Sequence, residues 1–137
     1  MDYKDLQPSP SPESLPFWEG LLEKKLLIQQ CSSCNLLRHY PRPMCHECYS
    51  LEYGWIQSKG EGAIHSWVTS YHPFHPAFTE KVPYITITAN LTEGVRLLAP
   101  VKNIESGRNL ELGGKVEVGF NVINPTLCLP YFKLSYI

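Results

Sequence analysis

The chain has 137 residues, of which 43% are hydrophobic and 12% aromatic, and its formal net charge is −1. This length allows one domain or two small ones, and no stretch approaches the roughly 20 apolar residues of a transmembrane helix. The charge also disfavours a general nucleic-acid-binding protein, which would present a basic face. Twelve prolines and nine glycines favour a turn-rich β protein over a helical one.

The first 25 residues are predicted to form a flexible arm, over residues 1–13, and a short amphipathic helix, over residues 14–25. Ser14 is suited to cap the helix, Pro16 to its first turn and Lys25 to its last. The apolar face consists of Leu15, Phe17, Trp18, Leu21 and Leu22. An isolated helix of this length is marginal in water. We therefore expect its aromatic face to dock on this domain's own sheet or on a partner subunit.

Two Cys-x-x-Cys pairs follow, Cys31/Cys34 and Cys45/Cys48, with ten residues between them. Each pair can form a tight turn that directs two sulfurs to one point, and the gap lets a hairpin bring the two points together. Four thiolates at about 2.3 Å around one ion form the closed tetrahedral site of structural zinc. Such a site keeps no open position for water or substrate. The motif therefore predicts a fold organised by zinc rather than a catalytic metal.

Disulfides, a redox pair and iron are the alternatives for these cysteines. The segment 1–16 is polar and lacks the apolar core of a secretory signal, so a reducing, cytoplasmic location is expected and metal is favoured over disulfides. A thioredoxin-like pair would need a βαβ unit, which is not indicated here. A rubredoxin-type iron site is not excluded, because thiolates accept both metals. The fifth cysteine, Cys128, is expected to be a small buried hydrophobic residue.

A zinc ribbon is predicted over residues 26–58, with strands at 26–30 and 51–57 and an extended, proline-stiffened connection at 38–43. Structural zinc contributes about 10–16 kcal/mol to the folding of finger peptides, whereas a small domain is stable by only about 5–15 kcal/mol. The segment is therefore expected to be unfolded without metal.

Residues 59–137 show the alternating pattern of β-strands. The period is two in the strands at 84–91 and 115–122, and further strands are predicted at 63–71, 95–101 and 131–137. Turns are predicted at 92–94, 113–114 and 124–125. Five short strands suit a small closed Greek-key barrel of the OB type, with an SH3-like barrel as the alternative.

A long aromatic loop, residues 71–83, separates the first two strands of this predicted barrel. It contains His72, Phe74, His75 and Phe78. Loops on rigid barrels often carry function, but this loop could equally pack its own aromatic rings across one end of the barrel. No carboxylate or nucleophile lies at a persuasive spacing from these histidines, so independent catalysis is not expected.

The order helix, ribbon, barrel resembles a known family with a rubredoxin-like zinc ribbon and an OB-fold, domain of unknown function 35, also described as acyl-CoA-associated. The resemblance covers residues 14–137. It rests on these segments: Pro16-Phe17-Trp18-Glu19-Gly20-Leu21, Cys31-Ser32-Ser33-Cys34, Tyr40-Pro41-Arg42-Pro43, Cys45-His46-Glu47-Cys48, His75-Pro76-Ala77-Phe78 and Val82-Pro83-Tyr84. The zinc segments alone would be generic, but their combination with the Phe-Trp-Glu-Gly helix is specific.

The resemblance implies a non-catalytic accessory subunit of a thiolase-fold enzyme, either a thiolase or a thiolase-like aldolase. Such a subunit would assist assembly and CoA-thioester binding in acyl-CoA degradation, and the catalytic residues would belong to the large partner. The family's zinc ligands correspond to the four cysteines of the two pairs. Candidate residues for contact with CoA or the partner are Trp18, Arg38, Arg42, His72, Phe74, His75 and Phe78. The two arginines could meet CoA phosphates, although a solvated surface role is the alternative.

A nucleic-acid-binding module is the second hypothesis, because zinc ribbons and OB-folds also bind nucleic acid through aromatic stacking and basic grooves. Here residues 59–137 contain seven Lys/Arg and six Glu, and residues 26–58 contain two Arg and two Glu. Since neither region carries a basic stripe, nucleic acid is not the expected partner.

Overall fold

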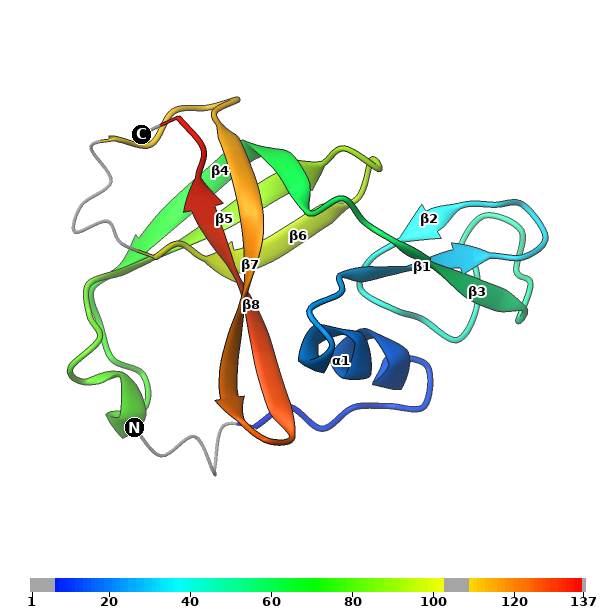
Figure 1. Cartoon of the computed structure of the whole chain (residues 1–137), viewed down its shortest axis with the longest axis horizontal. Coiled ribbons are helices and arrows are strands. Elements are labelled where there is room, and N and C mark those ends of the chain that lie inside the picture. Colours follow the sequence, from blue (N-terminus) through cyan, green and yellow to red (C-terminus); the bar gives the residue numbers. More distant parts are fainter. Residues whose placement is uncertain (1–6, 103–108, 137) are drawn as a thin grey trace.

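The computed structural model describes residues 7–102 and 109–136, which form two β-sheets with one α-helix between them (Figure 1). The elements in chain order are α1 (Leu15–Leu22), β1 (Leu27–Cys31), β2 (Leu37–Arg38), β3 (Tyr53–Gln57), β4 (Glu61–Ser70), the 3-10 helix η2 (Pro76–Phe78), β5 (Tyr84–Leu91), β6 (Arg96–Pro100), β7 (Lys115–Asn124) and β8 (Leu127–Leu134). The mainly β fold class with one N-terminal helix is confirmed. Parts of the predicted arm, 1–6, and of the predicted barrel, 103–108 and 137, lie outside the described residues.

Helix α1 is shorter than its amphipathic pattern predicted. Ser14 occupies the N-cap position, but its buried hydroxyl donates to the carbonyl of Ser11 at 3.2 Å and makes no capping bond, so the predicted side-chain cap is wrong. Lys24 adopts a left-handed φ of 63°, and the N–H groups of Lys24 and Lys25 donate back to the carbonyls of Leu21 and Gly20. This pairing is a Schellman motif, and it ends the helix before the two lysines.

The ribbon consists of an antiparallel three-stranded sheet in the order β2-β1-β3. Strand β1 is central: Leu27 to Cys31 pair with Gln57 to Tyr53 of β3, and residues 29–30 pair with 38–37 of β2. Helix α1 packs directly on this sheet, because a Cβ at Gly20 would lie 2.9 Å from Cγ of Leu27. A glycine at this position is what permits the close approach.

The second sheet has five antiparallel strands in the order β6-β5-β4-β7-β8. Among the described residues, one isolated parallel bridge connects the two edges of the sheet, between Val101, which directly follows β6, and Phe132 of β8. The closed barrel predicted from the sequence is therefore incorrect in this respect, and the sheet stays open. Strand β4 pairs with β7 over a short stretch, Glu61–Ala63 against Glu117–Lys115.

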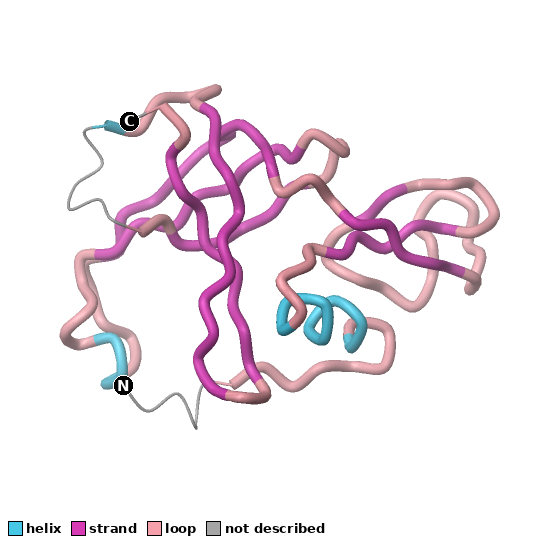
Figure 2. The backbone as a smooth tube through the Cα atoms, in the orientation of Figure 1, coloured by secondary structure: helices cyan, strands magenta, loops and turns pink. Residues whose placement is uncertain are grey.

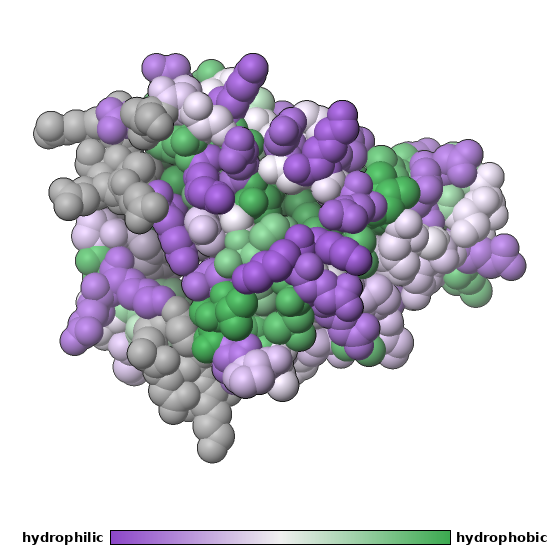
Figure 3. All heavy atoms as spheres, viewed as in Figure 1, coloured by the Kyte–Doolittle hydropathy of each residue, from purple (hydrophilic) through white to green (hydrophobic). Residues whose placement is uncertain are grey.

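Beyond that pairing, β7 and β8 continue together as a two-stranded arm, which Figure 2 shows extending away from the rest of the sheet. The arm packs against α1, and Figure 3 shows hydrophobic residues gathered over its lower half. Val122, on this arm, is 51% exposed, whereas Cys128 opposite it in the register is 1% exposed. The buried, hydrophobic interpretation of Cys128 is confirmed, and burial raises the pKa of its thiol.

One continuous hydrophobic core joins the helix and both sheets. Phe17 and Leu21 of α1 and Ile28 of β1 belong to the same cluster as Ile87 of β5 and Phe132 of β8. No helix among the described residues is long and apolar enough to cross a lipid bilayer.

Candidate metal centre and apolar cavity

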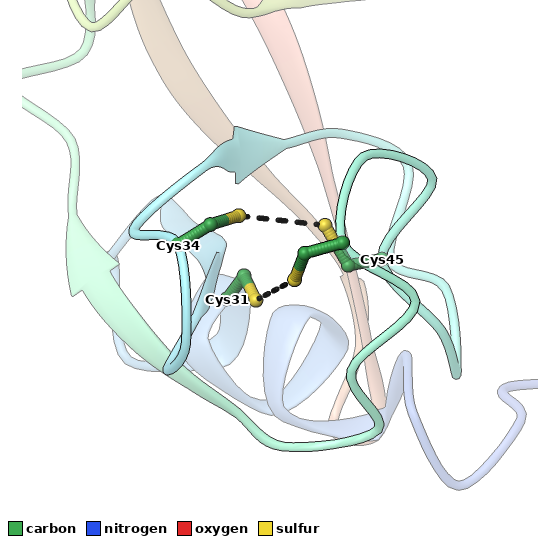
Figure 4. Close-up of side chains that lie close together, drawn as sticks. Cys31, Cys34 and Cys45 are labelled. Atoms are coloured by element: carbon green, nitrogen blue, oxygen red, sulfur yellow. Dashed lines mark hydrogen bonds between the residues drawn. The ribbon is translucent and has the colours of Figure 1, made fainter.

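The four predicted ligand cysteines converge at one end of the ribbon (Figure 4). Sγ of Cys31 lies 3.5 Å from Sγ of Cys48, and Sγ of Cys34 lies 3.6 Å from Sγ of Cys45. All four sulfurs lie within 4.8 Å of one another. A tetrahedron with bonds of about 2.3 Å to zinc has edges of about 3.8 Å. The four sulfurs are therefore arranged as one tetrahedral metal ion requires.

The two Cys-x-x-Cys turns have the same backbone construction. In the first, the N–H of Cys31 donates to the carbonyl of Leu36, and the N–H of Asn35 donates to the carbonyl of Cys31. In the second, Cys45 pairs with Ser50, and Tyr49 with Cys45, in the same way. Asn35 and Tyr49 adopt left-handed φ angles of 64° and 62°. In each turn the first cysteine is buried and the second is exposed.

Backbone N–H groups stabilise the thiolate form of the two buried cysteines. The pKa of Cys31 is lowered to about 6, chiefly because the backbone N–H of Cys34 hydrogen-bonds its sulfur. The pKa of Cys45 is lowered for the same reason by the N–H groups of Cys48 and Glu47, and the second of these lies 3.4 Å from the sulfur. Since the thiolate is the metal-binding form, the turns prepare these two sulfurs for metal.

The pKa values of the two exposed cysteines are shifted in the opposite direction, upward. The backbone N–H of Leu36 favours the thiolate of Cys34, but burial and hydrogen bonding with the neighbouring sulfurs outweigh it and raise the pKa of Cys34 to about 12. The pKa of Cys48 is likewise raised, against the effect of the N–H of Ser50. Four sulfurs this close cannot all be anionic unless a cation lies between them, which is what a divalent metal would supply.

Arg38 is not on the surface, so the sequence-based alternative of a solvated role for it is wrong. It is 4% exposed and its Nε donates to Oε1 of Gln29 at 2.6 Å, while Nη2 donates to the carbonyl of Arg42 at 3.1 Å. Gln29 also accepts from the N–H of Arg42 at 2.8 Å and donates to its carbonyl at 2.9 Å. This buried network fixes the 38–42 connection onto β1. Its geometry favours a structural role for Arg38, whereas the Arg42 side chain is exposed.

The candidate residues of the aromatic loop differ in their exposure and in their contacts. Phe74 is 87% exposed, and its ring meets that of His72 edge-on at 4.6 Å. The His75 side chain bonds to its own loop: its Nδ1 accepts the N–H of Ala77 at 3.1 Å and caps η2. The ring of Phe78 packs on Tyr84 with centroids 5.5 Å apart. Of these residues, His72 and Phe74 are exposed, whereas His75 and Phe78 are half-buried.

A cavity of about 700 Å³ lies between α1, β5, β6 and the β7–β8 arm, and sequence reasoning did not anticipate it. Trp18 lines it and donates from Nε1 to the hydroxyl of Tyr40 at 3.0 Å. His39, beside them, contacts the ring of Phe17 at 5.1 Å, and burial lowers its pKa to about 4. Strands β6 and β8, which are not neighbours in the sheet, both contribute to the lining of the cavity. No periodicity in the sequence signals this arrangement.

Comparisons with known proteins agree with this architecture. Residues 18–54 match the family described as ChsH2, rubredoxin-like zinc ribbon domain, and residues 55–121 match ChsH2, C-terminal OB-fold domain. A solved structure described as the Ltp2-ChsH2(DUF35) aldolase contains a chain 32% identical to this one, with a TM-score of 0.84, covering 94% of this chain and 99% of that chain. A DUF35-family protein of unknown function from Sulfolobus solfataricus is 16% identical, with a TM-score of 0.64 over 91% of this chain and 87% of that one, which shows the shared fold.

Two curated proteins are also similar. A probable enoyl-CoA hydratase alpha subunit from Thermomonospora curvata is 35% identical over 95% of this chain, and the 3-oxo-4,17-pregnadiene-20-carboxyl-CoA hydratase alpha subunit from Mycobacterium tuberculosis is 31% identical over 75%. The chain spans 40% and 32% of the length of these relatives. With both parts matched in order, and with the four-cysteine cluster and the open OB-type sheet in place, the chain belongs to the DUF35/ChsH2 family, which combines a rubredoxin-like zinc ribbon with a C-terminal OB-fold.

Proposed function

We propose that this chain is a zinc-binding, non-catalytic subunit that assembles with a thiolase-fold enzyme acting on CoA thioesters. The observation that carries the proposal is the similarity to a chain of the solved structure described as the Ltp2-ChsH2(DUF35) aldolase, because this chain covers 99% of that chain at 32% identity. The names of both curated relatives also specify alpha subunits that act on CoA thioesters. The reaction class shared by these relatives is the processing of an acyl-CoA.

The site chemistry supports a structural rather than a catalytic metal. Cys31, Cys34, Cys45 and Cys48 would hold one zinc ion, with iron as the alternative that thiolates also accept. Four sulfurs complete a tetrahedral shell and leave no position for a substrate or an activated water. Among the described residues, this is the one group of His, Cys, Asp and Glu side chains positioned to hold a metal. The metal would therefore fix the shape of the ribbon, and the chemistry would belong to the partner.

The exposed aromatic loop supports a partner interface. Tyr71 and Phe74 are 75% and 87% exposed, and Val68 on the neighbouring strand β4 is 62% exposed. Large exposed apolar side chains that lie together mark interaction surfaces, and aromatic residues dominate interface hot spots. These side chains fit a large subunit with an apolar docking surface better than a nucleic acid, because the whole chain carries a net charge of −1.

A hydratase subunit is the second candidate partner, because both curated relatives are named as hydratase alpha subunits. One experiment tests both possibilities: affinity purification of the chain from its native cells, followed by identification of the proteins that co-elute. A thiolase-fold enzyme in near-equal amount is the expected result. A hydratase in its place would redirect the proposal to that enzyme, and nucleic acid or transcription proteins without any CoA enzyme would refute it.

A further inference from the structure

Arg38 is a buried cation without an anionic partner. It is 4% exposed, and its guanidinium donates to two neutral oxygens, Oε1 of Gln29 at 2.6 Å and the carbonyl of Arg42 at 3.1 Å. Its remaining nitrogen, Nη1, is buried and has no hydrogen-bond partner. Within the part of the chain that the structure describes, the ion pairs involve other side chains. A buried charge is costly unless an opposite charge compensates it, so Arg38 calls for negative charge that no described carboxylate supplies.

The metal centre has the opposite imbalance of charge. Four thiolates around one divalent ion would leave two negative charges uncompensated. Cys31 and Cys45 are completely buried, so water screens the charge of their sulfurs poorly. The ribbon segment 26–58 contains two arginines and no lysine, and the side chain of Arg42 is exposed. Arg38 is therefore the buried cation of the ribbon.

The strand register places Arg38 on the same face of the ribbon sheet as Cys31. Arg38 lies opposite Gln29 of β1, and Cys31 is two residues further along the same strand, opposite Tyr53 of β3. Residues two apart on a strand point to the same face at a spacing of about 7 Å, and directly opposite residues share a face. The contacts agree, because Cζ of Arg38 lies 5.7 Å from the ring centroid of Tyr53 while its Nε bonds to Gln29. The guanidinium thus extends over β1 toward the end of the strand that carries the ligand cysteine.

We propose that Arg38 is the counter-charge of the metal centre: its guanidinium compensates part of the negative charge of the four metal-bound thiolates. The hydrogen bonds of Arg38 to Gln29 and to the carbonyl of Arg42 hold this charge in position. Charged and hydrogen-bonding groups outside the ligand shell tune the affinity and the reduction potential of metal sites in this way. The proposal rests on the metal-binding part of the proposed function and not on the partner enzyme.

The reduction potential of the iron-loaded full chain tests the charge of Arg38 separately from its hydrogen bonds, because thiolates accept iron as well as zinc. Reduction of iron(III) to iron(II) adds one negative charge to the site, and a nearby cation favours the reduced form. At a separation of roughly 10 Å and an effective dielectric constant of about 20, one unit charge changes such an equilibrium roughly tenfold. In Arg38→Met we therefore expect the potential to fall by about 59 mV, the one-electron equivalent of a tenfold change. Arg38→Lys retains the charge and loses the planar fork, so it should shift the potential much less.

Gln29→Glu is a second variant that keeps Arg38 in place, should Arg38→Met fail to fold. The new carboxylate can accept the same hydrogen bond from Nε of Arg38 and would neutralise its charge, so the potential should fall as in Arg38→Met. Arg42→Met is the matched control, because it removes an exposed charge from the same connection and should leave the potential unchanged. Competition with a chelator for Co²⁺ gives the same comparison without iron, and binding should be roughly tenfold weaker in Arg38→Met and Gln29→Glu.

The outcomes separate a counter-charge from a purely structural arginine. A potential that falls in Arg38→Met and Gln29→Glu, but not in Arg38→Lys or Arg42→Met, supports the counter-charge. The proposal is overturned if Arg38→Met and Gln29→Glu match the native chain in potential and Co²⁺ affinity, or if Arg38→Lys or Arg42→Met shifts the potential as far as Arg38→Met. A native chain that binds neither metal would overturn the metal centre and the counter-charge together. These measurements use no partner, so they succeed or fail independently of the co-purification.

Discussion

The ribbon and the five-stranded sheet are built on opposite principles, although one core connects them. The interior of the sheet is hydrocarbon: Ile87, Ala89 and Phe132 are completely buried. The interior of the ribbon holds the buried sulfurs of Cys31 and Cys45 together with Gln29 and Arg38. Apolar burial alone can stabilise the sheet, because the gain scales with the area removed from water. The ribbon replaces that gain with metal–ligand bonds and a buried polar network, so the two regions are expected to respond to different perturbations.

Removal of the metal is expected to have the largest effect on this molecule, and to act on one region. Metal ligation contributes about 10–16 kcal/mol in zinc-finger peptides, which exceeds what a small domain can lose. With a chelator, or in Cys45→Ser, we expect residues 26–58 to unfold while amides of β5 and β7 stay protected. Amide hydrogen exchange read by NMR measures both regions at once. Unchanged protection of the ribbon after verified metal loss would contradict this prediction.

Truncation of the apolar core is expected to produce the converse result. Phe132 is 0% exposed, and Phe132→Ala should lower the free energy of unfolding by about 3–5 kcal/mol, because it leaves a cavity. Metal binding should persist, since Phe132 belongs to β8 and contributes nothing to the cysteine turns. Denaturant unfolding of the zinc-loaded chain gives the first quantity, and the thiolate-to-cobalt absorption of the Co²⁺-substituted chain gives the second. Phe132→Leu, which retains most of the volume, is the control and should cost less than about 1.5 kcal/mol.

The polar interior of the ribbon can be tested at a single side chain. Gln29 is completely buried and makes three hydrogen bonds, at 2.6, 2.8 and 2.9 Å, to Arg38 and to the backbone of Arg42. Gln29→Leu would leave a buried guanidinium and a backbone N–H without these partners, which should cost about 2–4 kcal/mol. The neighbouring Gln30→Leu is the matched control, because Gln30 makes one exposed bond to the carbonyl of Asn35 at 3.2 Å. Equal losses in both variants would show that the network is not a stabilising feature.

One carboxylate hydrogen-bonds across the junction between the two regions. Glu93, in the turn after β5, accepts the hydroxyl of Ser58 at 2.6 Å and the N–H of Lys59 at 3.0 Å. Burial raises the pKa of Glu93, but these hydrogen bonds outweigh it and hold the pKa below its usual value. The carboxylate therefore contributes stability above its unfolded-state pKa, and this contribution is lost as the pH falls through the lower folded-state pKa.

Glu93→Gln should therefore cost about 1 kcal/mol at pH 7, and the difference from the native chain should shrink in acid. Thermal unfolding between pH 7 and pH 3 measures it. Glu117→Gln, an exposed residue of β7, supplies the control. A cost for Glu93→Gln that is independent of pH would mean that the charge of Glu93 plays no part.

Sequence reasoning predicted the features whose cause is local. The spacing of the cysteines gave the metal cluster, the period of two gave β5 and β7, and Asn124-Pro125 gave the turn between β7 and β8. It failed where the outcome depends on contacts between distant segments. In the sequence Arg38 could be a surface residue, but in the fold it is buried and bonded to Gln29 of β1. The open edge of the sheet likewise depends on how β6 and β8, which are far apart in the sequence, approach each other.

The same distinction explains what was missed at the candidate site. Trp18 and Leu98 are far apart in the sequence, and only the folded chain brings both to the lining of one cavity. Leu98 of β6 is an apolar side chain on the exposed face of its strand, and it is 65% exposed. Such a position is unremarkable singly, so it could not have been selected without the fold.

The aromatic loop provides the smallest expected effect on stability and a sharp test of the interface. Phe74→Ser removes a ring that is 87% exposed, so the free energy of unfolding should change by less than about 0.5 kcal/mol. If the ring anchors the partner, the affinity for the co-purified enzyme should fall by about tenfold or more, because hot-spot truncations cost more than about 1–2 kcal/mol. Leu112→Ser is the matched control, since Leu112 is 72% exposed and lies outside the loop. The loop belongs neither to the metal site nor to the hydrophobic core, so loss of one exposed side chain should not unfold the chain. An affinity loss seen in Phe74→Ser and not in Leu112→Ser would therefore show that the ring contributes to binding and not to stability.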